Sequence, residues 1–116
     1  MTLVIEMENK IFERVVLSLY KEFNIEINEI EKILTDEEYL NIVYLKDPVM
    51  IMKIEKSLEE LSKECQKESE FQRMRLSKYD TDDIVNAYMR SRTIERTVNS
   101  YIKFIKDNIK VTKGNR

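Results

Sequence analysis

The sequence has no histidine, and it has a single glycine, proline and cysteine in 116 residues. The lack of histidine removes the most common general base and metal ligand, together with any Ser-His or Cys-His nucleophile. A glycine-rich phosphate loop is excluded because the one glycine is Gly114. The one cysteine, Cys65, permits neither an internal disulfide nor a thiolate zinc site within one chain. We therefore expect no enzymatic activity, no metal and no cofactor.

The scarcity of glycine and proline also bears on fold class. A sheet protein needs many tight turns, whose residues must tolerate positive φ. Charged residues make up 36% of the chain, which is typical of helical bundles with solvated outer faces and also of chains from heat-adapted organisms. The composition favours an all-α protein, and 116 residues are enough for one hydrophobic core.

Long apolar runs are absent as well. None approaches the roughly 20 residues that a membrane span requires, and the N-terminus lacks the basic flank of a signal peptide. We expect a cytoplasmic protein with no membrane partner.

The net charge of −2 hides an asymmetry along the chain. Residues 1–89 contain 12 Lys and Arg against 20 Asp and Glu, whereas residues 90–116 contain 8 against 2. An acidic body with a basic C-terminal segment has three interpretations: an acidic partner surface, a nucleic acid, or pairing with the chain's own acidic helices.

Residues 80–110 are predicted to form one long amphipathic helix. Small or apolar residues recur at steps of three and four, which mark one face of a helix: Ile84, Ala87, Ser91, Ile94, Val98, Tyr101, Ile102, Ile105 and Ile109. A basic stripe lies off this seam, formed by Arg92, Arg96, Lys103, Lys106 and Lys110. We expect the seam to be buried and the stripe to face solvent, where it is a candidate contact for nucleic acid or an acidic partner.

The earlier part of the chain predicts further helices. Residues 8–23 form an amphipathic helix, with 1–7 as its frayed start, and residues 27–34 repeat at helical spacing. Thr35 and Glu38 have the spacing of a capping box that opens a short helix.

Asp47-Pro48 is the sharpest boundary in the sequence, because Asp caps helices and Pro is well tolerated at the first helical position. The long helix that follows places Cys65 on its apolar register, and it either continues through residues 68–72 or loosens there. A further break is predicted at residues 79–81. The expected architecture is an antiparallel helical bundle of four to five helices with a long C-terminal helix pair, forming one domain over 1–111 with a flexible tail at 112–116.

A row of carboxylates on this long helix is a candidate magnesium site. Glu60, Glu64 and Glu68 recur every four residues, as in bundle enzymes that hold Mg²⁺ with acidic motifs. Three lysines at 56, 63 and 67 are interleaved with them, however, which is the pattern of an exposed helix face. We interpret the row as solvated.

Two arginines flank the seam in the last helix. Arg90 and Arg92 lie on either side of Ser91, where their guanidinium groups can pair with carboxylates of a packed helix. We expect partners on the preceding helix such as Glu60 or Glu64, in an inter-helix clamp.

This segment resembles the helical domain of GINS-complex subunits, factors of the archaeal and eukaryotic replicative helicase. The resemblance lies in Tyr88, Arg90, Arg92 and Ile94, with a loose echo in TDEEYL at 35–40. Thr93 stands where the family commonly has Lys. Most members add a small β-domain, so the resemblance implies a member consisting of the helical domain alone, with these four residues at a partner or assembly interface.

The resemblance implies a non-catalytic assembly or adaptor protein for DNA replication, acting as a homo- or hetero-oligomer with protein partners. A second interpretation is a nucleic-acid-binding protein that uses the basic stripe with Tyr101 and Phe104 beside it. A third is a small viral or mobile-element protein that blocks a host complex by helix packing.

Overall fold

The computed structural model describes the backbone of residues 2–78 and 81–109, and within these ranges the side chains from Glu8 onward. This part of the chain is all-α, as predicted, and consists of five helices: α1 (Thr2–Phe23), α2 (Ile27–Thr35), α3 (Glu37–Lys46), α4 (Pro48–Lys78) and α5 (Asp82–Asn108). None of these helices is long and apolar enough to cross a membrane. The predicted tail at 112–116 lies outside the described residues.

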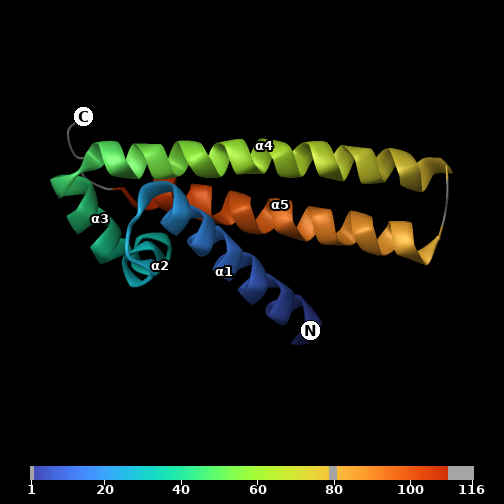
Figure 1. Ribbon diagram of the computed structural model, residues 1–116, viewed down its shortest axis with the longest axis horizontal. Coiled ribbons are helices and arrows are strands. Elements are labelled where there is room, and N and C mark those ends of the chain that lie inside the picture. The colour runs from blue at the N-terminus through green and yellow to red at the C-terminus, as the bar shows by residue number, and fades with distance from the viewer. Residues whose placement is uncertain (1, 79–80, 110–116) are drawn as a thin grey trace.

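The two long helices, α4 and α5, form an antiparallel hairpin along the 51 Å length of the molecule (Figure 1). The three shorter helices gather around one half of this hairpin, where α4 begins and α5 ends (Figure 1). We call this half the base, and the remainder, which carries the connection between α4 and α5, the arm. The predicted long C-terminal pair is therefore confirmed.

The hydrophobic core lies in the base, where all five helices contribute to one cluster. Its buried residues are Ile11, Val15, Val16, Leu19, Ile25, Ile30, Ile33, Leu34, Leu40, Ile51, Ile54, Leu58, Val98, Ile105 and Ile109. Among the described residues, Ile84 is the one buried apolar side chain outside this cluster. Because apolar burial is the main source of folding free energy, the base carries most of the stability.

Apart from Ile84, the buried side chains of the arm are polar. Ser69 and Gln72 of α4 and Ser91 and Glu95 of α5 are buried there, and Ser62 is buried at the border with the base. The predicted apolar seam is confirmed over the base, but the sequence did not predict that Glu95 would be buried with it. A helix pair that joins through serines and a glutamate gains less from burial than one joined through Ile and Leu.

Helix boundaries follow from local side-chain chemistry. Asn24 adopts a φ of 56° after α1, a conformation that Asn tolerates better than most residues. Asp47 accepts a hydrogen bond from the Met50 amide at 3.1 Å, so the predicted cap before Pro48 is confirmed. Thr81 accepts from the Ile84 amide at 3.4 Å at the start of α5.

The predicted capping box at Thr35 is wrong by one residue. The Thr35 hydroxyl donates back to the Glu31 carbonyl at 2.7 Å, inside α2. Asp36 is the cap of α3 instead, accepting from the amides of Glu38 and Tyr39. An aspartate between two short helices can end one and begin the next, which is why α2 and α3 are separated by a single residue.

The structure also decides whether α4 is interrupted and where α5 ends. The helix α4 is continuous through residues 68–72, so its polar stretch does not interrupt it. The helix α5 ends at Asn108, whereas the sequence predicted a helix to residue 110, a position outside the described residues. Asn41 of α3 donates from Nδ2 to the Asn108 carbonyl at 2.8 Å and so satisfies an acceptor at this helix end.

Candidate functional site

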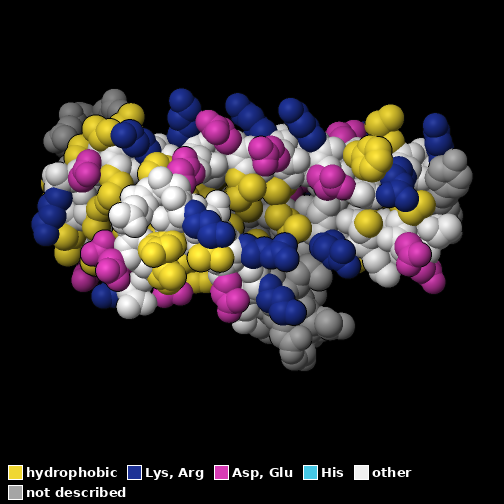
Figure 2. All heavy atoms as spheres, viewed as in Figure 1, with side chains coloured by type: hydrophobic (Ala, Val, Ile, Leu, Met, Phe, Trp, Pro, Cys, Tyr) yellow, Lys and Arg dark blue, Asp and Glu magenta, His cyan; other side chains and the backbone are white. Residues whose placement is uncertain are grey.

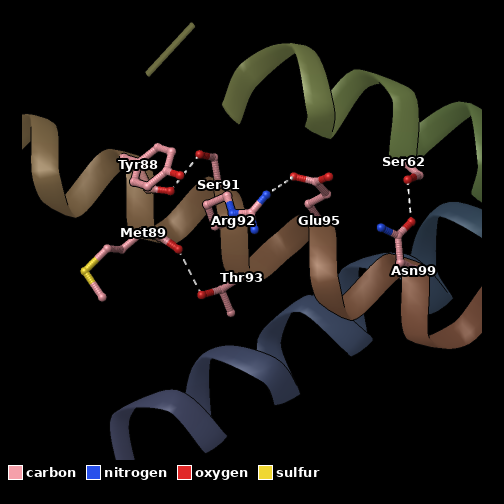
Figure 3. Close-up of polar contacts among 8 residues, drawn as sticks. All are labelled: Ser62, Tyr88, Met89, Ser91, Arg92, Thr93, Glu95 and Asn99. Carbon is pink, nitrogen blue, oxygen red and sulfur yellow. Dashed lines mark hydrogen bonds and ion pairs between the residues drawn. The ribbon is translucent and has the colours of Figure 1, made fainter. Parts of the chain in front are cut away.

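The predicted clamp from α5 to the preceding helix does not form between the residues expected. Arg92 Nη1 lies 3.4 Å from Glu95 Oε1 on its own helix (Figure 3). The expected partners Glu60 and Glu64 are exposed. A carboxylate three residues along the same helix is already within reach of the guanidinium. Arg92 is half-buried and its side chain is 40% exposed, against 11% for Glu95, so the pair sits at the edge of the seam.

The other members of the GINS-like pattern occupy different sides of α5. Tyr88 is half-buried, and its carbonyl accepts from the Ser91 hydroxyl at 2.9 Å (Figure 3). Arg90 is exposed, and Ile94 is half-buried against the core cluster. Residues two apart on a helix face roughly opposite directions, so the structure does not bring Tyr88, Arg90, Arg92 and Ile94 together as one surface.

The basic stripe is divided between internal pairing and solvent. Lys106 Nζ lies 3.1 Å from Glu59 Oε2 and 3.8 Å from Glu55 Oε2, both on α4. The hydrogen bond with Glu59 is the main cause of a raised pKa for Lys106. This part of the stripe therefore pairs with the chain's own acidic helix, one of the three interpretations of the charge asymmetry.

The remaining stripe residues have separate surroundings. Lys103 Nζ lies 3.7 Å from Asp107 Oδ2 within α5, and Lys110 lies outside the described residues. Arg96 is exposed and makes no ion pair with any residue of the described chain. Figure 2 shows Lys and Arg side chains gathered along α5 on this face of the molecule.

Cys65 lies at the arm's interface rather than in the core. It is partly exposed, so the apolar register on which the sequence places it is only partly buried at this position. Burial raises the pKa of the Cys65 thiol, and the carboxylates of Glu95 and Glu64 raise it further. One helical turn away, the Ser62 hydroxyl donates to Asn99 Oδ1 at 2.5 Å and links α4 to α5 (Figure 3).

A groove of about 520 Å³ runs between α1 and α5. It is lined by Glu8, Asn9, Phe12, Thr35, Thr93, Arg96, Thr97, Ser100 and Tyr101. The rings of Phe12 and Tyr101 pack with centroids 5.5 Å apart. Burial raises the pKa of Tyr101, with a second contribution from the Glu8 carboxylate on the facing helix. We call this feature the α1–α5 groove; the sequence did not predict it.

A second surface feature lies where α3 meets α4. Four large apolar side chains are exposed there, which we call the corner patch: Ile42 (49% exposed), Leu45 (65%), Val49 (56%) and Met52 (60%). Figure 2 shows apolar side chains gathered at this end of the molecule. Their spacing, three residues apart on each helix, could have indicated a second apolar face, but α3 also carries inward-facing apolar residues that obscure it.

The carboxylate row of α4 does not gather into a metal site. Glu60, Glu64 and Glu68 are exposed, and Glu68 accepts from Gln72 Nε2 at 2.6 Å. Across the described residues there is no group of three or more His, Cys, Asp or Glu side chains placed to hold a metal ion.

No protein-family model, curated protein or solved structure matches this chain.

The surroundings of Arg92 and Arg96 predict different effects of mutation. Arg92→Ala leaves the buried Glu95 without its ion-pair partner, so we expect a loss of about 1–2 kcal/mol in the free energy of unfolding. Arg96→Ala removes an exposed side chain and should change stability by less than about 0.5 kcal/mol. Urea unfolding of the two variants measures both values, and equal stabilities would contradict the placement of Arg92 at the seam.

Proposed function

We propose that this chain is a cytoplasmic, non-catalytic assembly or adaptor protein that binds protein partners through the corner patch. The observation that carries the proposal is the exposure of Ile42, Leu45, Val49 and Met52 on a chain whose base already has a well-formed core. Single exposed apolar residues are ordinary. A group of four at one corner is instead the kind of surface that proteins use to bind each other.

The charge around the corner patch suggests the chemistry of the partner. Lys53 and Lys56 lie one turn beyond Val49 and Met52 on α4, and all of these residues are exposed. Lys46 adjoins Leu45 at the end of α3. An apolar centre beside three lysines favours a partner segment with apolar side chains and acidic neighbours, since complementary charge gives an interface its specificity.

The chain supplies a matched control for this surface. Val49→Glu with Met52→Glu places two charges in the corner patch, while Phe71→Glu with Met74→Glu places two charges on the same helix at the same spacing. The four residues are 55–62% exposed, so neither double variant should unfold the protein. Both are expressed with an affinity tag in the cells that make the protein, and co-purified proteins are quantified against wild type.

The expected result is that the Val49/Met52 variant loses specific partners by at least about tenfold, as charges buried at an interface core do, while the Phe71/Met74 variant keeps them. Retention of every partner by the Val49/Met52 variant would contradict the proposal.

Replication is a narrower proposal, and its support is the resemblance of Tyr88, Arg90, Arg92 and Ile94 to GINS-complex subunits. It predicts that the partners recovered above include components of a replicative helicase. If the recovered partners instead belong to a host complex, the result would support the third interpretation, in which the chain is a viral or mobile-element protein that blocks that complex by helix packing.

Nucleic-acid binding is the competing proposal, favoured by the exposed Arg90 and Arg96 on α5. Pairing of Lys106 with Glu55 and Glu59 lowers the charge available to phosphates. Fluorescence anisotropy with labelled DNA and RNA separates the two functions. Affinity that falls steeply with salt and is lost in the Arg90→Ala/Arg96→Ala variant would replace the adaptor proposal.

A further inference from the structure

The α1–α5 groove has walls of opposite charge. Glu8 stands on the α1 side and Arg96 on the α5 side, and both side chains are exposed. They do not form an ion pair with each other, and neither makes one with another residue of the described chain. The groove therefore presents a carboxylate and a guanidinium to whatever enters it.

The floor and the α5 wall suit a helix. The packed rings of Phe12 and Tyr101 supply an apolar surface. On α5, the hydroxyls of Thr93, Thr97 and Ser100 donate to carbonyls of their own helix at 2.7–2.9 Å. Their protons are thus occupied. Thr97 is already buried, while the half-buried Thr93 and the exposed Ser100 are short side chains against which another helix can pack.

The α1 helix continues past the groove. Figure 1 shows its N-terminal half running away from α5. Its first described side chains, Glu8 to Lys10, are exposed, and Ile11 is the first buried residue among the described side chains of α1. The sequence of residues 2–7, TLVIEM, contains four apolar residues.

We propose that a second copy of this chain closes the groove, with α1 of each copy lying against α5 of the other about a two-fold axis. In such an interface, a contact from one residue to a second is repeated in reverse. Glu8 then pairs with the partner's Arg96, and Arg96 pairs with the partner's Glu8. An acidic partner would match Arg96 but oppose Glu8, and a basic one would do the reverse; a second copy matches both.

This self-association uses a different surface from the corner patch, so it goes beyond the proposed adaptor function and can fail independently of it. The Val49→Glu/Met52→Glu variant should dimerise as wild type does. Conversely, groove variants should retain the partners that the corner patch binds.

Charge reversal provides the test, read by light scattering and analytical ultracentrifugation of the full chain. Wild type is expected to show twice the 14.0 kDa chain mass. Glu8→Arg and Arg96→Glu should each raise the dimer dissociation constant by about tenfold or more, because each places like charges in both symmetric pairs. The Glu8→Arg/Arg96→Glu double variant should dimerise again.

Mixing the two single variants is the most specific part of this test. One copy then carries two arginines and the other two glutamates at the paired positions, so a heterodimer should form although neither variant dimerises well alone. Glu13→Arg on α1 and Arg90→Glu on α5 are exposed positions outside the groove lining and serve as controls that should leave the dimer unchanged.

Thermal melts confirm that each variant is folded. A monomeric wild type overturns the proposal, and so does a dimer that neither single reversal weakens. Failure of both the double variant and the mixture to restore the dimer also overturns it, because that result would show that Glu8 and Arg96 do not face each other across the two copies.

Discussion

Val98→Asp is expected to unfold the protein or to lower its melting temperature drastically. Val98 is fully buried in the core cluster, where α5 meets the other helices of the base. A carboxylate placed there has no cation to pair with, and burying an unpaired charge costs several kcal/mol. That cost is a large part of the roughly 5–15 kcal/mol by which a domain of this kind is stable.

Two companion substitutions calibrate this result. Ile94→Asp lies on the same seam, but Ile94 is only half-buried, so its loss should be clearly smaller than that of Val98→Asp. Asn86→Asp adds a charge at an exposed position of the same helix and should change stability by less than about 0.5 kcal/mol. Circular dichroism melts of the three variants give the comparison, and an unchanged melting temperature for Val98→Asp would mean that α5 is turned the other way.

Those features of the fold that depend on local sequence were predictable. The three-and-four spacing from Ile84 to Ile109 fixes which face of α5 can be buried, and that face is buried in the base. Asp47-Pro48 marks a helix start through the chemistry of two adjacent residues. Thr35 was predicted as a cap from its spacing to Glu38, but the next residue, Asp36, caps α3 instead.

The features that depend on how helices cross were not predictable. Glu95 looks like a surface residue in the sequence, but its position on α5 faces α4 and buries it. Arg92 pairs with it because the two are three residues apart, whereas Glu60 and Glu64 lie on the outside of α4. The α1–α5 groove exists because α1 diverges from α5 (Figure 1), and no single-helix pattern encodes that angle.

The corner patch could not be predicted from the sequence for a similar reason. Ile42 and Leu45 share α3 with Leu40, which is fully buried. A helix with apolar residues on more than one side does not reveal which side the core will take. The assignment requires the neighbouring helices, and what remains exposed afterwards is the evidence for a binding function.

The molecule is divided into a base that holds the hydrophobic core and an arm whose buried side chains, apart from Ile84, are polar. Buried apolar side chains from all five helices meet in the base, while Ser69, Gln72, Ser91 and Glu95 occupy the interior of the arm. Local opening costs less where fewer apolar contacts must be broken, so the two halves of the same helices should differ in stability.

Native-state amide hydrogen exchange along α4 and α5 tests this division most directly. Amides of residues 51–58 and 98–105 should exchange most slowly, at rates set by global unfolding, while those of residues 69–76 and 84–91 should exchange at least about tenfold faster through local opening. Equal protection along the whole length of both helices would contradict the division.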